Sequence, residues 1–217
     1  MVVYMKIEQI TVGTMGVCCY LVSCEKTKKA ALIDVGGDED RVLAAIEKAG
    51  LDLQYIIATH GHPDHVCGNR RIQEATGAKI IMHALDAEFF AKAEVKDHFS
   101  HLGLEFSPPV DITVVDGDTI NIGEVVLKVL HTPGHTPGGM CLYNNDGPDG
   151  DLFTGDTLFV TAVGRTDFMG GNHQDLLNSI RTKLFVLPDE TIVWPGHGYG
   201  GDRSHIGFEK RANPFLK

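Results

Sequence analysis

The sequence predicts a one-domain α/β protein in which two β-sheets pack face to face and helices cover the outside. Three observations lead to this prediction. The length of 217 residues is typical of one domain. A content of 43% hydrophobic and 22% charged residues is an ordinary globular composition. Each half of the chain contains several strand-like runs together with helical segments, which favours two sheets with outer helices. We therefore expect one domain over residues 1–217.

The first half begins with three strand-like runs, each ended by glycine or charged residues. Residues 38–50 carry apolar side chains at helical spacing, begin with acidic residues and end at Gly50, which predicts a helix. Residues 84–103 are helical or irregular, with no clear ends. The remaining predictions for this half are strands at 5–12, 16–23, 30–35, 53–60 and 78–84, and a helix at 68–77.

The second half repeats the strand-rich pattern. Residues 112–132 indicate a strand, a turn and two further strands, with Asp116-Gly117 and Ile122-Gly123 as turn signals. Residues 138–156 predict two strands around a polar loop. A helix over 172–188 stops at Pro188, and 191–198 is predicted as the final strand.

Charge and composition exclude several classes of protein. The formal net charge of −10 disfavours a protein that binds nucleic acid through its phosphates. No stretch is apolar enough to span a membrane, and the first residues do not resemble a secretory signal. Five cysteines without a C-x-x-C pair fit a reducing compartment, with Cys18, Cys19 and Cys24 buried in a strand and Cys67 in a packing role. We expect a cytoplasmic protein with a small-molecule substrate and no nucleic-acid or membrane partner. The sequence specifies no oligomeric state.

The most informative segment is Thr59-His60-Gly61-His62-Pro63-Asp64-His65. Gly61 and Pro63 argue against a helix here. In an extended segment alternate side chains share a direction, so His60, His62 and Asp64 are expected to converge on one spot, with His65 reaching a neighbouring one. Imidazole and carboxylate groups clustered in this way are suited to a transition metal. The eleven histidines of the chain agree with such a site.

Three later residues fit the same picture. His135, Asp156 and His197 each lie just past a predicted strand, in a turn rich in glycine or proline that allows the backbone to approach an ion. His131 is a competing candidate, but it lies inside the strand-like run and is expected to be a buried or supporting residue.

The motifs T-H-x-H-x-D-H (59–65), G-H-T-x-G (134–138), G-D-T-L-F (155–159) and P-G-H-G (195–198) together resemble the metallo-β-lactamase superfamily, in particular its glyoxalase II (hydroxyacylglutathione hydrolase) branch. The resemblance implies an αββα sandwich with a two-metal site at one edge. It assigns His60, His62 and His135 to one ion and Asp64, His65 and His197 to the other, with Asp156 bridging both. The expected cofactors are two divalent ions, zinc foremost, with iron or manganese as alternatives.

The same resemblance implies a function. A hydroxide shared by the two ions would hydrolyse a thioester such as an S-acyl glutathione, and Asp64 would carry a proton to the departing thiol. Glyoxalase II has a C-terminal helical domain that binds glutathione, and because 20 residues follow His197 in this sequence, we do not expect that domain here. Arg165 falls where glyoxalase II has a lysine near the glutathione carboxylate.

The other expected substrate contacts are Tyr199, which matches the tyrosine of the family's G-H-E-Y, and Asp167, which replaces a common tyrosine. Gly198 replaces the glutamate of that motif. The alternative for Arg165 and Asp167 is that they pair with each other.

Other activities stay open at this point. A persulfide dioxygenase has similar motifs and would use a single iron, held either on the side of His60, His62 and His135 or by the two-histidine, one-carboxylate set His60, His135 and Asp156. A lactonase or an inert metal-binding protein would also keep the ligand set. Secreted β-lactamases have Cys or Ser in place of Asp156 and a signal peptide, so that class is not expected.

Overall fold

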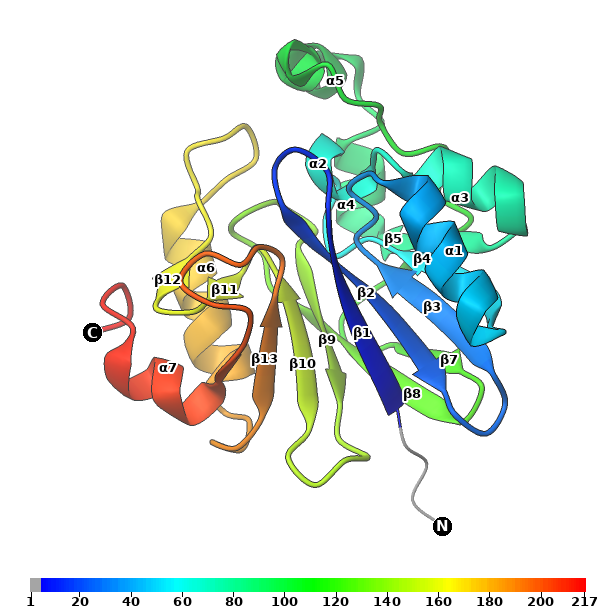
Figure 1. Cartoon of the computed structure of the whole chain (residues 1–217). Helices are drawn as coiled ribbons and strands as arrows, with labels where there is room; N and C mark the ends of the chain where they lie inside the picture. The colour runs from blue at the N-terminus through cyan, green and yellow to red at the C-terminus, as the bar shows by residue number, and fades with distance from the viewer. Residues whose placement is uncertain (1–4) are drawn as a thin grey trace.

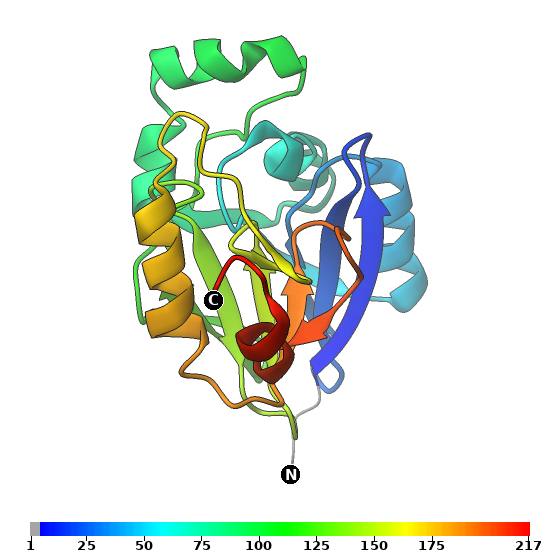
Figure 2. The same ribbon diagram turned by 90° about the vertical axis from the view of Figure 1, so that its left-hand side faces the viewer.

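The computed structural model describes residues 5–217, which form two six-stranded sheets packed face to face with helices on both outer faces (Figure 1, Figure 2). The fold class expected from the sequence, an αββα sandwich, is confirmed. In the first sheet the strands keep their chain order, with antiparallel pairing up to β3 and parallel pairing from there. Its strands are β1 (Met5–Val12), β2 (Val17–Cys24), β3 (Lys29–Ile33), β4 (Asp52–Ile57), β5 (Lys79–His83) and β6 (Ile112–Val114).

The second sheet has the order β14-β13-β10-β9-β8-β7, and only β10 and β13 pair in parallel. A separate hairpin joins β11 (Leu158–Phe159) and β12 (Ala162–Val163). The strands of the second sheet are β7 (Thr119–Ile122), β8 (Val125–His131), β9 (Met140–Asn144), β10 (Asp151–Gly155), β13 (Ile192–Pro195) and β14 (Ser204–His205).

The helices follow the division into two sheets. Figure 2 shows α1 on one outer side of the sandwich and α6 on the other, while α5 stands above one end of the strands. The elements are α1 (Glu39–Ala49), α2 (Pro63–Val66), α3 (Asn69–Thr76), α4 (Ala84–Phe89), α5 (Ala93–Phe99), a 3₁₀ turn η1 (Ser100–Leu102), α6 (His173–Ser179), a π-helical turn η2 (Ile180–Leu184) and α7 (Ile206–Ala212). Among residues 5–217, no helix combines the length and apolar character needed to cross a membrane.

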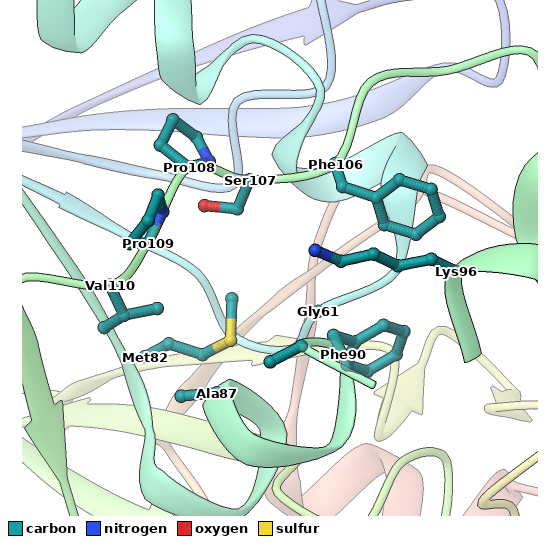
Figure 3. A pocket seen from close by; sticks show the side chains of 11 residues that line it. Gly61, Met82, Ala87, Phe90, Lys96, Phe106, Ser107, Pro108, Pro109 and Val110 are labelled. Atoms are coloured by element: carbon teal, nitrogen blue, oxygen red, sulfur yellow. The ribbon is translucent and has the colours of Figure 1, made fainter. Parts of the chain in front are cut away.

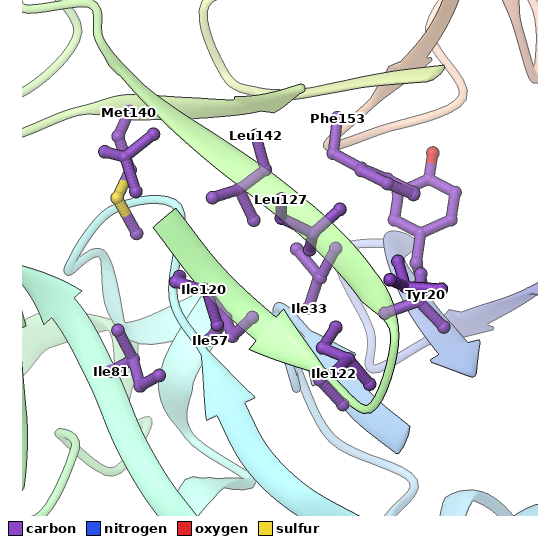
Figure 4. Close-up of a cluster of buried hydrophobic side chains, with 14 of the residues drawn as sticks. Tyr20, Ile33, Ile57, Ile81, Ile120, Ile122, Leu127, Met140, Leu142 and Phe153 are labelled. Atoms are coloured by element: carbon purple, nitrogen blue, oxygen red, sulfur yellow. The ribbon is translucent and has the colours of Figure 1, made fainter. Parts of the chain in front are cut away.

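The core between the sheets is built by alternate residues of facing strands. Figure 4 shows Ile33 and Ile57 of the first sheet meeting Leu127 and Leu142 of the second. Intervening residues of the same strands point outward and are covered by helices, as Leu32 is by α1 and α3. Because both faces of the central strands are buried, these strands are continuously apolar in sequence rather than alternating.

The cysteines pack as expected. Cys18, Cys19 and Cys24 are buried in β2, and all five cysteines of the chain are free thiols. Cys67 is half-buried, and burial raises the pKa of its thiol to about 11, which agrees with a packing role.

Two sequence predictions are corrected near the C-terminus. The strand at 192–195 is not the last element, because β14 pairs with it and α7 follows. A two-residue strand is too short to show a period in the sequence. The single helix predicted over 172–188 is α6 followed by the π turn η2, and it ends at Leu184. For residues 84–103 the sequence predicted helical or irregular structure without clear ends, and the structure places α4, α5 and η1 there.

Tyr20 links the core to the carboxyl end of β13 in the second sheet. Its ring packs between the sheets, and its hydroxyl donates to the carbonyl of Pro195 at 2.6 Å. We predict that Tyr20→Phe lowers the free energy of unfolding by about 1.5 kcal/mol, because the buried carbonyl loses its donor. Urea unfolding measures this loss. Tyr55→Phe, also packed against this core, is the control, and an equal loss in both variants would contradict the role of the hydroxyl.

Candidate metal centre

The side chains singled out in the sequence come together at one edge of the sandwich. His60 follows β4, His135 follows β8, Asp156 follows β10 and His197 follows β13. Each of the four comes after the carboxyl end of a strand, so the two sheets bring their loops to a common place. The seven predicted ligands contribute to a single buried centre.

Three histidines form the first group. The ligand atoms of His60, His62 and His135 all lie within 4.8 Å of one another, and the three side chains are buried. His62 Nδ1 lies 2.9 Å from His135 Nε2. Three imidazole nitrogens at this spacing match the first sphere of a transition-metal ion.

The second group consists of Asp64, His65 and His197, again buried and within 4.8 Å. His65 Nε2 lies 3.2 Å from His197 Nε2, and Asp64 Oδ2 lies 3.5 Å from His197 Nε2. This group can hold a second ion next to the first.

Asp156 lies between the two groups. Its Oδ1 is 3.4 Å from His65 Nε2, and its Oδ2 is 3.5 Å from His135 Nε2 and 3.7 Å from His197 Nε2. One carboxylate therefore faces ligands of both groups, which is the position expected of a bridging ligand.

The local prediction for residues 59–65 was wrong in one respect. The segment is not extended throughout, because the one-turn helix α2 begins at Pro63. Proline is favoured at the first position of a helix, where its missing N–H would have no partner, so it starts this turn rather than preventing it. As a result Asp64 joins His65 and His197 instead of converging with His60 and His62.

Oxygen atoms outside the centre orient the imidazole rings of four of the histidines. In four histidines Nδ1 faces an oxygen, which holds the proton on Nδ1 and leaves the Nε2 lone pair directed into the centre. The pairs are His60 with Thr59 Oγ1 (3.1 Å), His65 with Asp34 Oδ2 (3.0 Å), His135 with the Arg165 carbonyl (2.6 Å) and His197 with the Met15 carbonyl (3.2 Å).

Several buried polar atoms of the centre have no hydrogen-bond partner among residues 5–217, including His60 Nε2 and Asp156 Oδ1. Such atoms are costly in a protein interior unless a ligand satisfies them. Imidazole nitrogens with carboxylate oxygens are the donor set of zinc and iron, so the residues present fit a divalent metal.

The charges of the centre suit a cation. Burial, reinforced by neighbouring histidines, lowers the pKa of His62 to about 3, and burial likewise lowers the pKa of His60, so both are neutral and able to ligate. Burial alone would raise the pKa of Asp156, but the positive charge of His65 outweighs burial and lowers this pKa well below its usual range. Burial also opposes the charging of His65, but Asp156, Asp64 and Asp34 raise its pKa. A metal ion therefore competes with a proton on His65, and metal affinity falls as the pH falls.

Asp34 is a functional residue that the sequence reasoning missed. Its buried carboxylate accepts hydrogen bonds from the Thr59 N–H (2.8 Å) and Thr59 Oγ1 (2.7 Å) and from His65 Nδ1. Its backbone is left-handed, with φ of 57°, a conformation that non-glycine residues adopt rarely and that often marks functional sites. The available signal was an acid directly after a buried strand and before Gly36-Gly37.

Asp86 was missed as well. It is fully buried and accepts from the Gly61 N–H (2.9 Å), Thr136 Oγ1 (2.8 Å) and the Gly138 N–H (2.5 Å). Burial raises its pKa to about 6, so the carboxylate is ionised at neutral pH and accepts all three bonds. Asp86 therefore ties the loop that carries His60 and His62 to the loop that carries His135.

His131 supports the centre rather than facing it, as the sequence indicated. Its ring stacks on His83 with centroids 4.1 Å apart, and its Nε2 lies 2.9 Å from the Pro137 carbonyl. It therefore contributes to holding the loop around His135.

A cavity of about 390 Å³ opens onto the two ligand groups. Apolar side chains such as Phe99, Leu102 and Phe168 form much of its wall, and Arg165 and Tyr199 are among its polar lining. The Tyr199 ring stacks on His197 with an angle of 9° between the planes. The shape and the mixture of groups are those of a small-molecule site.

Arg165 and Asp167 pair with each other, as in the alternative derived from the sequence. Arg165 Nε and Nη2 donate to the two carboxylate oxygens of Asp167 at 2.9 and 2.8 Å, and the guanidinium lies over the Phe168 ring at 4.3 Å. Asp167 thus holds Arg165 at the cavity, while Asp167 itself is not among the lining residues.

The profile of the Metallo-beta-lactamase superfamily matches residues 12–197. The chain belongs to this superfamily. The family predicted from the motifs is thereby confirmed, and the superfamily's divalent metals agree with the donor set of the centre.

Named relatives extend the comparison. The chain is 35% identical to hydroxyacylglutathione hydrolase GloC of Haemophilus influenzae over 98% of both chains. Among solved structures it resembles the BLEG-1 B3 metallo-beta-lactamase (TM-score 0.88, 30% identity, 98% of this chain and 100% of that one). ETHE1 from Myxococcus xanthus gives a TM-score of 0.80 at 33% identity over 96% and 83%. TTHA1623 in a di-iron-bound form gives 0.81 at 32% identity over 96% and 100%. The likeness to a B3 metallo-beta-lactamase means that fold alone does not separate that class from this chain.

We predict that Asp86→Ala lowers the free energy of unfolding by about 3 kcal/mol at neutral pH, because two buried N–H donors and a hydroxyl lose their acceptor. Urea unfolding checks this value. Asp97→Ala, which removes an exposed acid from α5, should change the value by less than about 0.5 kcal/mol. Equal effects in the two variants would show that Asp86 does not hold the loops.

Metal removal provides a second prediction. Since the ligand groups exist only in the folded chain, bound metal stabilises the folded state by about 3 kcal/mol at a free concentration near 100 times the Kd. A strong chelator should therefore lower the Tm of the metal-loaded protein by roughly 5 to 10 °C, and added zinc should restore it. Differential scanning calorimetry measures the shift, and an unchanged Tm would contradict a metal centre at these residues.

Proposed function

We propose that this protein is a cytoplasmic metal-dependent hydrolase that cleaves thioesters of the S-acyl glutathione class with two divalent ions, zinc foremost. The observation that carries the proposal is the pair of buried ligand groups on either side of Asp156. Similarity to a hydroxyacylglutathione hydrolase over nearly the whole chain supports the substrate class. The five free cysteines support a reducing compartment.

In this proposal His60, His62 and His135 would hold one ion, Asp64, His65 and His197 would hold the other, and Asp156 would serve both groups. The likeness to a di-iron-bound protein supports two ions and keeps iron as an alternative to zinc. Two divalent ions bound there would supply a nucleophilic water at neutral pH and a positive charge beside a carbonyl oxygen.

The cavity supports the choice of substrate. Its apolar wall accepts the acyl group, and its size suits part of a small peptide thioester. Arg165 has five N–H donors and uses two of them on Asp167, so three remain for a substrate carboxylate at the rim. Tyr199 and Arg165 line the same cavity, and the two side chains are proposed to orient the thiol portion of the substrate.

Asp64 is the residue that we propose as the proton carrier. Only 8% of the residue is exposed, and it lines the cavity. Burial alone would raise the pKa of Asp64, but the charge of His65 outweighs burial and lowers this pKa. The carboxylate is therefore ionised and can accept a proton. In the proposed reaction Asp64 Oδ2 would face the ion, while the other oxygen, Oδ1, would hold a proton released from water and transfer it to the departing thiolate.

We predict that the metal-loaded protein contains two ions per chain and releases thiol from S-acyl glutathione, and that Asp64→Asn lowers kcat by about 100-fold because the amide cannot accept the proton. Elemental analysis and a thiol-reactive dye measure the two quantities. Asp97→Asn serves as the surface control and should retain full activity.

Assays with other substrates distinguish the thioesterase from the other candidate activities. One iron per chain with O₂ consumption on a persulfide would indicate the oxygenase, which would use His60, His135 and Asp156. Hydrolysis confined to a lactone or a β-lactam would indicate those classes instead. Binding of metal without turnover of any substrate would indicate an inert metal-binding protein. Each of these results would overturn the thioesterase proposal.

A further inference from the structure

A second cavity, of about 180 Å³, lies between α4, α5 and the segment that leads to β6. Its wall is largely apolar: Met82, Phe90, Phe106 and Val110 contribute side chains (Figure 3). An apolar cavity near this size is large enough to hold a small ring or a short alkyl chain. It shares no lining residue with the cavity at the metal centre.

Two polar residues line this cavity, the exposed Lys96 and the half-buried Ser107. Figure 3 shows the Lys96 ammonium and the Ser107 hydroxyl on the wall of the same cavity, with the Met82 thioether below them. Within residues 5–217, Lys96 forms no ion pair. Ser107 Oγ accepts a hydrogen bond from Asn69 Nδ2 at 3.1 Å, and this bond turns the hydroxyl hydrogen away from Asn69 and makes it available to a ligand.

The donors define the ligand chemistry. A cationic ammonium and a hydroxyl donor on the wall of one cavity match a carboxylate, whose two oxygens can each accept one bond. The apolar wall behind them matches a short aliphatic chain. A neutral alcohol of the same length would fill the wall but leave the ammonium unpaired, and a dicarboxylate would place a second charge against Met82 and Val110.

The cavity also adjoins the metal centre. Gly61 lines it between His60 and His62, and the Phe90 ring lies so close to Gly61 that a Cβ at Gly61 would come within 2.2 Å of it. The centroid of the Phe90 ring is 5.4 Å from that of His62. A ligand in this cavity therefore contacts the reverse side of the segment that carries two of the metal ligands.

We propose that this second cavity binds a short-chain monocarboxylate, with its carboxylate between Lys96 and Ser107 and its alkyl chain against Met82 and Phe90. The site is separate from the catalytic cavity, and the proposal does not depend on the reaction catalysed there. A compound of this size is expected to bind with a Kd on the order of a millimolar.

Methyl-labelled methionine and NMR test the location on the metal-loaded protein. Titration with hexanoate should shift the Met82 methyl signal, assigned with Met82→Leu, in a saturable manner. Met15 lines the cavity at the metal centre and provides the internal control, because hexanoate bound to the ions would move the Met15 signal instead. Saturable shifts confined to Met15, or no saturable shift at Met82, would overturn the proposal.

Variants test the chemistry. Lys96→Met and Ser107→Ala should each weaken hexanoate binding, by about tenfold for Lys96→Met because a charge-assisted bond is lost. Lys92→Met is the matched control: Lys92 lies just before α5, pairs with Glu88 and does not line the cavity, so binding should be unchanged. Ala87→Met, which fills the cavity, should abolish the shift of Met82. Unchanged affinity in both Lys96→Met and Ala87→Met, or hexanol binding as tightly as hexanoate, would contradict a carboxylate site here.

Discussion

The hydrogen bonds of one buried carboxylate, that of Asp34, organise the metal centre. Asp34 follows β3, and its backbone N–H is bonded to the Ile57 carbonyl at the end of β4 (3.0 Å). Its oxygens accept from Thr59 and from His65 Nδ1, and Thr59 Oγ1 in turn accepts from His60 Nδ1. His60 belongs to the first ligand group and His65 to the second, so a single acid sets the tautomers of ligands in both.

The sandwich supplies the second constraint, since the centre lies where the two sheets meet. The Thr59 carbonyl accepts from the Met140 N–H at 2.9 Å, and the Gly196 carbonyl accepts from the Cys18 N–H at 2.8 Å. Both bonds connect a strand or loop of one sheet to the other, next to a ligand-bearing turn. Loops that carry ligands are thereby attached to two rigid sheets, which keeps the geometry of an open, polar site inside an apolar protein.

Sequence patterns predicted the fold and singled out the residues that gather at the candidate metal centre, because both depend on local signals. Apolar runs mark the strands, and the turns after four of these strands carry the candidate ligands. Other features have no local signal. The carboxylates of Asp34 and Asp86 bind groups 25 to 52 residues away in the chain, so nothing near them in sequence identifies their partners. The helical turn at Pro63 depends on a proline that permits either a break or a start.

The most direct test of the organising role of Asp34 is calorimetric titration of the metal-depleted protein with zinc, compared with Asp34→Asn. The amide keeps the size of the side chain but replaces one acceptor oxygen with a donor that faces Thr59 or His65. The account predicts that Asp34→Asn folds with its secondary structure intact and binds zinc between about 10 and 100 times more weakly. Zinc affinity equal to that of the wild type would show that the centre does not depend on this carboxylate.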